Sequence, residues 1–548
     1  MKRTIILILS LFFLVTMNSH SAPSVSISVS SVDTHVQEQE NGDLSLNVSD
    51  SDAAAFQSAG HVRYSDFGAI GDGQTDDSNA IAATHAYANQ SNLKVQADAG
   101  ATYYIGGRER KAIVQTDTNF GDASFIIDDT EVENKDAPIF EVRSKLKAFE
   151  LKGLTSLRRN QKRIRVDLPG PCLITVTDSD TKRYIRYGLN QNNGSAQTDI
   201  FVVDKNGKLD RNAPIIWDFE QITDCTAIPI DEENLSIIGG KFTTIANQDE
   251  SKYNYYDRNL TIRRSNVIVD GLEHRVIGEG EQGAPYGGFI NIRDSSYVTV
   301  KNTILTGRKT YATIGSAGKP VKMGSYDIIV NRSLNVSFIN CSQTNDIHDR
   351  TYWGVMSSNF SKNLLYDNCT LSRFDAHMGV ANATIRNSTL GHMGINAIGT
   401  GTLTLENSSV HGYHLINLRP DYGSTWEGTI VVSDCRFVPA NGWPIRASLI
   451  GGRNSTQHDF GYTCYLPEKI VIKNLEIDDS NHPDSYDGPA IFSDFTPEMA
   501  AENFHETHPY VRPKKVLLRT VTTASGKSLR LSDNPQAFEG VKVITRKR

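Results

Sequence analysis

The chain has 548 residues, a formal net charge of −7 and a pI near 6.1. This mildly acidic balance argues against nucleic acid as a partner, because nucleic-acid-binding domains carry a surplus of basic residues. The length would hold several ordinary domains, yet a solenoid that grows in one dimension needs no such division.

The N-terminal residues 1–22 are typical of a secretory signal peptide. A basic pair precedes an apolar run over residues 5–15, and small residues follow it. The run is too short to cross a bilayer, so we expect no membrane partner and a protein that is secreted or periplasmic. Residues 23–60 are rich in Ser, Val, Asp and Gln without a period, which predicts a flexible leader with little fixed structure.

A motif rich in glycine and aspartate opens the next segment, residues 61–142. It contains, in order, Asp66-Phe67-Gly68-Ala69, Gly71-Asp72-Gly73, Thr75-Asp76-Asp77 and Ala80-Ile81. The motif resembles the opening of the pectate-lyase-like superfamily of right-handed parallel β-helix carbohydrate-active proteins. The resemblance implies an N-terminal cap, in which a short helix started by Thr75-Asp76-Asp77 closes the open end of a solenoid, followed by the first coils. It implies no particular reaction, because the superfamily includes hydrolases, lyases, epimerases and phage tailspikes.

Residues 143–230 break the pattern of the flanking segments and are interpreted as a β-rich insertion. Turn signals at Asn193-Gly194 and Asn206-Gly207 predict hairpins within it. The segment also carries a basic patch, formed by Arg158, Arg159, Lys162, Arg163 and Arg165. We interpret the patch as a solvated face, with a polyanion-binding surface as the alternative.

From residue 231 onward a strand pattern repeats, in which two apolar residues at alternate positions are followed by Asn, Gly or Asp. The clearest copies are Leu364-x-Tyr366-x-Asn368, Ala383-x-Ile385-x-Asn387 and Leu403-x-Leu405-x-Asn407. A repeat of about 20 residues with alternating apolar side chains is typical of one coil of a parallel β-helix, whose stacked coils bury a common core. Asn, Gly and Asp tolerate the left-handed backbone of a corner, and Asn can bond to the next coil.

The sequence therefore predicts an all-β protein whose main body, residues 231–548, is a right-handed, single-stranded parallel β-helix. Near its end, Thr496-Pro497-Glu498 predicts the start of a brief helix. Three closing strands are expected at residues 516–518, 529–531 and 541–544. The six cysteines could pair outside the cytoplasm, but thiols stacked in neighbouring coils explain their positions equally well.

Ionisable and aromatic side chains concentrate on the coils between residues 309 and 419, where neighbouring coils place side chains about 4.8 Å apart. A linear groove lined by cations, bases and aromatic rings fits a linear polymer, and we expect an acidic polysaccharide as the partner. We assign substrate binding to Lys309, Tyr311, Arg350, Asp375, Asn396 and Arg419, and catalysis to Arg373, His377, His392, Tyr413 and His414.

This composition favours β-elimination at a uronic acid. The reaction needs a cation or hydrogen-bond donor on the sugar carboxylate, a base for the C5 proton and an acid for the leaving oxygen. We therefore predict a polysaccharide lyase that cleaves a glycosaminoglycan-, pectin- or alginate-like chain. The assigned roles are the base for His377, the carboxylate contact for Arg373 or Arg419 with Asn396, and the leaving-group donor for His392, Tyr413 or His414.

Two other functions stay open. A glycoside hydrolase needs two carboxylic acids, which Asp346, Asp349 and Asp375 could supply. A non-catalytic carbohydrate-binding or tailspike-like protein would bind the same polymer without cleaving it. No cofactor is required and no metal ligand is assigned, although Lys309 with the three aspartates could imitate the Ca²⁺ site of some β-helix lyases. We expect a monomer or a small homo-oligomer.

Overall fold

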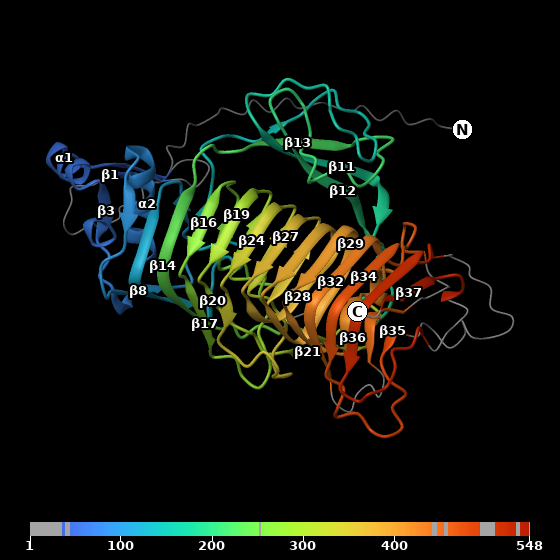
Figure 1. The fold of residues 1–548 in the computed structure, drawn as a ribbon. Coiled ribbons are helices and arrows are strands. Elements are labelled where there is room, and N and C mark those ends of the chain that lie inside the picture. The colour runs from blue at the N-terminus through green and yellow to red at the C-terminus, as the bar shows by residue number, and fades with distance from the viewer. Residues whose placement is uncertain are drawn as a thin grey trace, which may run out of the picture.

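The computed structural model describes residues 35–38, 44–250, 254–440, 447–453, 459–493, 510–532 and 538–546. They form one long stack of coils with a smaller sheet lying alongside it (Figure 1). The expected signal peptide, the start of the leader and the brief helix at Thr496 lie outside the described residues. Within the described part of the chain, no helix has the length and apolar character needed to cross a membrane.

The coils stack so that their strands form three faces, and within each face neighbouring coils pair as parallel strands. The first face pairs, in order along the axis, β3 (His61–Arg63), β5 (Lys94–Gln96), β8 (Thr118–Asp128), β14 (Leu235–Ile245), β16 (Val267–Asp270), β19 (Ser296–Lys301), β24 (Leu334–Ile339), β27 (Lys362–Asp367), β28 (Thr370–Arg386), β29 (Thr389–Glu406), β32 (Trp426–Pro439), β34 (Lys469–Ile477), β36 (Lys515–Thr523) and β37 (Lys542–Arg546). From β14 to β34 these strands carry the repeated sequence pattern.

The longer strands of the first face turn a corner and continue into the second. The shorter strands of the second face are β4 (Asp72–Asp76), β6 (Thr102–Ile105), β17 (Glu273–Ile277), β20 (Ile304–Leu305), β25 (Ser342–Gln343) and β30 (Ser409–Gly412). The third face holds parts of β28 and β29 together with β7 (Ala112–Val114), β9 (Phe140–Val142), β15 (Leu260–Ile262), β18 (Ile290–Arg293), β23 (Ile328–Asn331), β26 (Met356–Asn359), β31 (His414–Leu418), β33 (Ser448–Gly451) and β35 (Ala490–Phe492).

The predicted corner residues all adopt the left-handed backbone. Positive φ angles are found at Gly239, Gly271, Asn302, Asn340, Asn368, Asn387, Asn407, Asp434 and Asn474. Several of the asparagines also bond along the stack, as in the bond from Asn340 Nδ2 to Asn302 Oδ1 at 2.7 Å and the bond from Asn407 Nδ2 to Asn387 Oδ1 at 2.8 Å. The corner column therefore links the coils through side chains as well as through strands.

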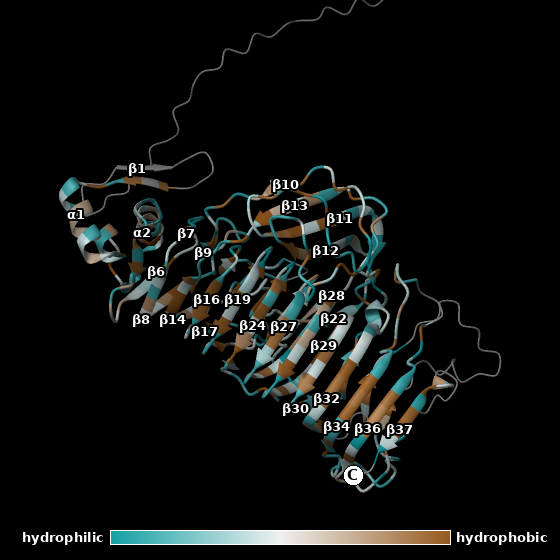
Figure 2. Cartoon of the chain, turned by 45° about the horizontal axis from the view of Figure 1, so that its top comes forward, coloured by the Kyte–Doolittle hydropathy of each residue, from teal (hydrophilic) through white to brown (hydrophobic). Residues whose placement is uncertain are grey.

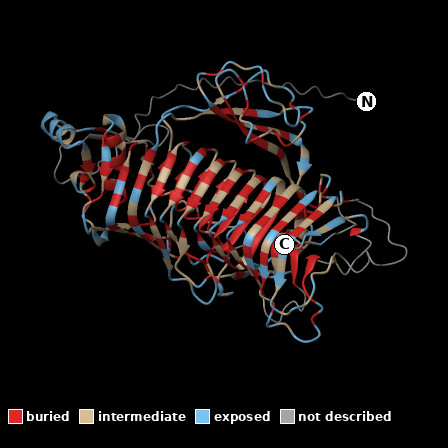
Figure 3. Ribbon diagram, in the orientation of Figure 1, coloured by how far each residue is buried: buried red, intermediate tan, exposed pale blue. Residues whose placement is uncertain are grey.

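Alternate apolar residues of the coils belong to one continuous buried core. Figure 2 shows hydrophobic and hydrophilic segments side by side along the coil strands. Figure 3 shows the resulting alternation of buried and less buried positions along the coil strands. Leu364, Tyr366, Leu403 and Leu405 are among the buried side chains, as the repeat predicts. All six cysteines are buried and none forms a disulfide. Truncating a core leucine of this kind to alanine costs about 2–5 kcal/mol in other proteins.

At the N-terminal end, helix α2 (Ser78–Ser91) follows the turn η1 (Ser65–Phe67) and packs beside the first coils. The carboxylate that meets the start of the helix belongs to Asp76, whose Oδ1 accepts the Ser78 amide at 3.0 Å. The Asp77 side chain instead accepts the amides of Ile70 and Gly71 and fixes the glycine-rich turn. Asp76 and Asp77 of the motif thus accept hydrogen bonds from backbone amides and have a structural role.

The second half of the expected leader differs from the prediction. It forms a hairpin of β1 (His35–Glu38) and β2 (Leu44–Asn47), then helix α1 (Asp50–Ala59). Ser49 caps α1 by accepting the Asp52 amide, and Gly60 ends it with a φ of 71°. The amino-acid composition failed to predict this helix because α1 is short and exposed and so carries no strong apolar pattern. Its ends are determined by its caps.

Within residues 143–230, four antiparallel strands form a separate sheet with its own apolar cluster. They are β10 (Phe149–Glu150), β11 (Cys172–Arg183), β12 (Ser195–Val203) and β13 (Asp224–Pro229), and we call residues 149–229 the lobe. A buried ion pair joins the lobe to the stack, with Lys362 Nζ 2.7 Å from Asp199 Oδ1. A further hairpin, β21 (Tyr311–Ile314) with β22 (Pro320–Met323), projects from the coils.

Candidate active site

A cavity of about 410 Å³ opens beside the third face, between the coil loops and hairpin β21–β22. Five of the residues assigned from sequence line it, namely Arg350, His392, Asn396, Tyr413 and His414. The structure adds Lys322, Tyr352, Trp353 and Asn417, which were not among the assigned residues. We call this space the histidine cavity.

The asparagines of the histidine cavity are placed by strand register. Asn396 of β29 lies directly beside Asn417 of β31, and Asn417 Nδ2 donates to Asn396 Oδ1 at 2.8 Å. Asn396 Nδ2 in turn donates to the Met393 carbonyl at 2.9 Å. The pair forms a fixed polar floor because both side chains are held by hydrogen bonds.

Both imidazoles of the cavity are held by contacts on Nδ1. His392 Nδ1 lies 3.0 Å from the carbonyl oxygen of Ile347. Because a carbonyl oxygen can only accept a hydrogen bond, Nδ1 of His392 carries the proton. That of His414 lies 2.6 Å from the Ser448 hydroxyl. Burial lowers the pKa of His414 to about 4, and burial also lowers the pKa of His392 although its bond to Ile347 opposes the shift. Both rings are neutral at pH 7, and a neutral imidazole can accept a proton.

Cations dominate the charge of the cavity. The Arg350 guanidinium lies 5.4 Å from the ring centre of Tyr413, which is 36% exposed. Lys322 extends the positive charge from strand β22. Among the described residues that line the cavity, none carries a carboxylate. The cavity therefore offers positive charge, neutral imidazoles and phenols, which suits an anionic ligand.

Four other assigned residues form a separate, more buried group. The Arg373 guanidinium donates to Asp375, and Arg419 Nη1 lies 3.2 Å from the same carboxylate. Arg419 also pairs with Asp421 at 2.9 Å, and the lobe contributes Arg186 to Asp421 at 2.9 Å. Burial raises the pKa of Asp375 while the two guanidiniums beside it oppose the shift. We call this group the arginine cluster.

His377 lies with the arginine cluster and not among the residues that line the histidine cavity. Its Nδ1 contacts Asn359 Oδ1 at 2.7 Å, and its ring packs edge-on against Tyr422 at 5.3 Å. Burial and the nearby positive charges of Arg419 and Arg186 hold the pKa of His377 well below its usual range. Trp353 separates the two groups, since its ring lines the cavity and also lies 5.7 Å from the Arg373 guanidinium.

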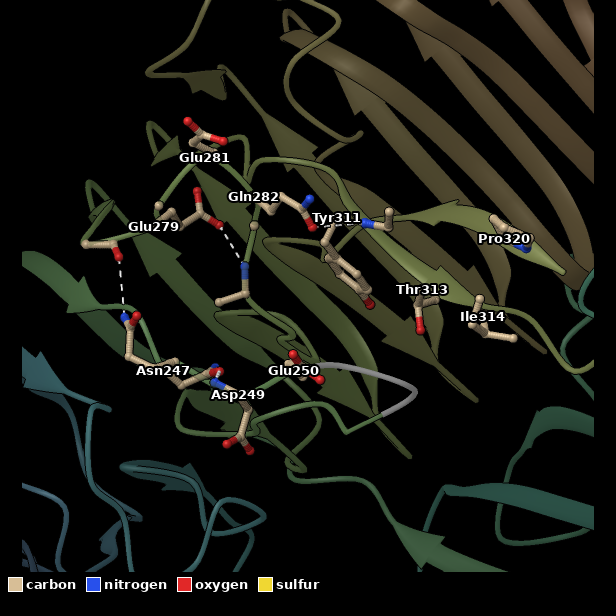
Figure 4. A pocket seen from close by; sticks show the side chains of 16 residues that line it. Asn247, Asp249, Glu250, Glu279, Glu281, Gln282, Tyr311, Thr313, Ile314 and Pro320 are labelled. Atoms are coloured by element: carbon tan, nitrogen blue, oxygen red, sulfur yellow. Dashed lines mark hydrogen bonds between the residues drawn. The ribbon is translucent and has the colours of Figure 1, made fainter. Parts of the chain in front are cut away.

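The last two assigned residues lie at a third place. Tyr311 lines a cavity of about 790 Å³, whose lining also carries Asp249, Glu250, Glu279 and Glu281 (Figure 4). Backbone atoms of Lys309 meet this acidic cavity, because the Lys309 amide donates to Glu279 Oε2 at 3.1 Å. The Lys309 ammonium donates to the Gly280 carbonyl at 2.5 Å. The band expected from sequence is therefore divided among three places.

The aspartates considered for a hydrolase do not share one site. Asp346 and Asp349 hold turns, since they accept the amides of His348 and Thr351 at 2.9 and 2.8 Å. Asp375 is buried in the arginine cluster. Over the described residues, no group of three or more His, Cys, Asp or Glu side chains is arranged to hold a metal ion.

The assigned residues were expected side by side in columns counted from the corner asparagines, but the number of residues after each corner varies from coil to coil. Counting from the corner asparagines predicts Asp375 beside His414 and His377 beside Asn396. The structure instead stacks Asp375, Asn396 and Asn417 in register. Irregular register between β28 and β29 near Leu371 and Ala376 causes the slip. Asn417 could have been found at the corrected spacing, whereas Lys322 lies on a hairpin outside the repeat.

Comparisons with known proteins agree on the architecture. No protein-family model matches the chain. The crystal structure of tailspike gp61 from Pseudomonas phage phi297 aligns with 88% of this chain and 83% of its own, with a TM-score of 0.51 and 13% identity. The chain has the β-helix fold of that tailspike. The resemblance to β-helix proteins drawn from the N-terminal motif is therefore confirmed for the fold.

A local sequence match adds a second relative. The chain is 31% identical over 126 residues to a capsule KL64-specific depolymerase of Klebsiella phage P510. The match spans 20% of this chain and only 12% of the relative. The gp54 tailspike of Acinetobacter baumannii bacteriophage AP22, solved with a capsular saccharide, aligns with 86% of this chain and 77% of its own, at a TM-score of 0.45 and 11% identity.

Proposed function

We propose that the protein is a polysaccharide lyase that cleaves an acidic polysaccharide at the histidine cavity. The observation that carries this proposal is the lining of that cavity, where Arg350 and Lys322 stand with two neutral histidines and two tyrosines and no described carboxylate. A depolymerase among the sequence relatives supports a polysaccharide as the substrate class. The phage origin of that relative bears on neither the reaction nor the location of this chain.

In the proposed reaction, Arg350 and Lys322 with Asn396 and Asn417 neutralise the uronate carboxylate, which makes the C5 proton more acidic. His414 takes that proton, and its electron pair forms the double bond between C4 and C5. The bond from C4 to the glycosidic oxygen breaks, and this oxygen takes a proton from a tyrosine of the cavity. The products are a shortened chain and an unsaturated uronate end.

The base is therefore reassigned in this proposal from His377 to His414. A base must reach the same sugar ring as the groups that bind its carboxylate. Asn417 and Asn396 line one cavity with His414, whereas His377 lies among arginines that already pair with aspartates. The low pKa of free His414 rises when a carboxylate binds beside it, which strengthens the base in the complex.

The test is to offer polygalacturonate, alginate and hyaluronan to the purified protein and record ultraviolet absorbance of unsaturated uronate together with new reducing ends. We expect both signals on at least one polymer, unchanged by a chelator because cations of the protein bind the carboxylate. His414→Ala should lower the rate about 10²- to 10⁴-fold. The matched control is His411→Ala, another half-buried histidine with a pKa of about 4 that lies outside the cavity. Reducing ends without absorbance would contradict the lyase.

The acidic cavity supports a second candidate, a glycoside hydrolase. Burial raises the pKa of Glu279, which favours a protonated acid, while Asp249 and Glu281 are exposed on the same cavity. Such a difference between neighbouring carboxyls is what hydrolysis of a glycosidic bond uses. Here Glu279→Gln would abolish new reducing ends while His414→Ala would not. The opposite pattern supports the lyase.

A further inference from the structure

The last three coils carry a regular grid of cations on the first face. Strand β34 presents Lys469 and Lys473 outward, and these two columns continue in register as Lys515 with Arg519 on β36 and as Lys542 with Arg546 on β37. Five of the six residues are exposed and Lys515 is partly exposed. A central row of half-buried aliphatic side chains separates the columns, formed by Val471, Leu517 and Ile544.

Like charges placed directly opposite each other on neighbouring strands destabilise a sheet, so this arrangement has a cost. The same column is built differently upstream. Asp270 there neighbours Lys301 at 3.1 Å, and Asp367 neighbours Arg386 at 2.7 Å. In the described part of the last three coils, none of the six cations has an ion-pair partner. In the upstream coils this column therefore pairs opposite charges on neighbouring strands. In the last three coils it places only cations next to one another.

Protection of the last described strand, β37, does not account for the grid. A few charges on the terminal strand suffice to prevent edge-to-edge pairing. The grid instead begins two coils inward, at β34 (Figure 1). The grid is also more regular than protection of a strand edge requires, because each column holds a cation on all three of the strands β34, β36 and β37.

We propose that this basic grid is a second binding surface for the acidic polysaccharide, outside the catalytic cavity. Cations in each column are spaced by the distance between coils, about 4.8 Å, which is close to the length of one sugar unit in a chain. A polyuronate laid along the axis therefore meets a cation at each sugar. The two columns lie about 13 Å apart, four residues along a strand. The aliphatic row between them gives the sugar rings a flat, partly apolar floor.

The choice of polymer rests on the proposed function, but the binding does not need the cleavage. The grid lies on the first face and the histidine cavity beside the third, so one stretch of a long chain can be held while another is cut. The grid therefore raises the affinity for long chains and has no effect on short oligosaccharides. A membrane surface is a poorer fit, because the floor of the grid lacks the projecting apolar side chains that insert between lipids.

The experiment measures binding of alginate and polygalacturonate by affinity electrophoresis at low salt, with neutral dextran as a blank. One variant replaces Lys473, Arg519 and Arg546 by Gln, and a second replaces Lys469, Lys515 and Lys542 by Gln. We expect each to weaken polymer binding about tenfold or more, which is about 1.4 kcal/mol. The affinity of each variant should also depend less on salt. For turnover, KM should rise on the long polymer, with kcat and cleavage of a short oligosaccharide unchanged.

The matched control removes the same charge elsewhere, by replacing by Gln three exposed cations outside both the grid and the basic patch of the lobe, Arg108, Lys147 and Lys241. Equal weakening by this control would reduce the effect to net charge and overturn the inference, as would wild-type affinity of both grid variants. Tighter binding of the grid to anionic phosphatidylglycerol vesicles than to the polymers would also overturn it. Loss of binding in a protein that cleaves no polymer would support the grid and refute the proposed lyase.

Discussion

The histidine cavity and the arginine cluster lie on either side of Trp353 and draw on the same kinds of residue, yet they differ in how charge is compensated. In the cluster, Arg373 and Arg419 share Asp375; Arg373 and Asp375 are buried and Arg419 is largely so. In the cavity, the Arg350 guanidinium lies against the ring of Tyr413, and no carboxylate among the described residues pairs with it. Charge that is already paired holds a fold together, while charge left beside a cavity is available to a ligand. This contrast favours the histidine cavity as the proposed active site.

The largest expected effect is on the stability of the cluster. Asp375→Asn leaves the buried Arg373 and the largely buried Arg419 without their shared carboxylate and should lower the free energy of unfolding by about 3–5 kcal/mol. Urea denaturation at pH 7 measures this loss. The exposed Asp136→Asn serves as the control and should change stability by no more than about 0.5 kcal/mol. A stable Asp375→Asn protein that has lost only activity would move the active site into the cluster.

A smaller effect is expected at the cavity. Arg350→Gln keeps a hydrogen-bond donor but removes the charge that faces the substrate carboxylate, and should lower kcat/KM about 10- to 100-fold. Unfolding should be unchanged within about 0.5 kcal/mol because Arg350 is exposed. Initial rates of unsaturated-product formation together with a melting curve give both numbers. Equal losses of rate and stability would erase the contrast between the two regions.

The dependence on pH gives the smallest but sharpest distinction. The pKa of His414 is about 4, so the base is neutral above this value and is lost as the pH falls through it. The plot of kcat/KM against pH should therefore be flat from about pH 5 to 7 and bend downward near 4. The corresponding bend in kcat should lie at higher pH, because the bound carboxylate raises the pKa of the imidazole. A bend in kcat/KM near pH 6.5, the usual range of a free histidine, would remove His414 from the role of base.

Stability follows a related course, which has to be measured alongside. His414 has a lower pKa in the folded state than in the unfolded chain, so the unfolded chain takes up the proton first. The contribution of this group to stability is complete above about pH 6.5 and declines as the pH falls toward 4. Asp421 acts in the other sense, since its arginine partners lower its pKa and its contribution is lost only below about pH 4. The ion pairs of Asp421 should thus persist to a lower pH than the activity of the cavity, whereas Asp375, whose pKa is raised by burial, takes up its proton at a higher pH than Asp421.

The coils could be predicted from sequence because their geometry is local and periodic. Asn368, Asn387 and Asn407 mark corners with a left-handed backbone, which few residue types adopt without strain. The alternating apolar residues before each of them identify the side chains that are buried. The proposed site was less predictable because it lies where the repeat is interrupted. Arg350 and His414 were found by residue type, but Lys322 reaches the cavity from a hairpin that no coil spacing describes. Burial also turned Arg373 from an expected ligand contact into an internal ion pair.

The six cysteines lead to a practical consequence. Each thiol is enclosed in the interior and none is joined to another, so no covalent bridge contributes to the cohesion of the rod. The coils are held together by strand pairing, by the common apolar core and by the ion pairs to the lobe. The melting temperature of the protein should therefore be indifferent to dithiothreitol.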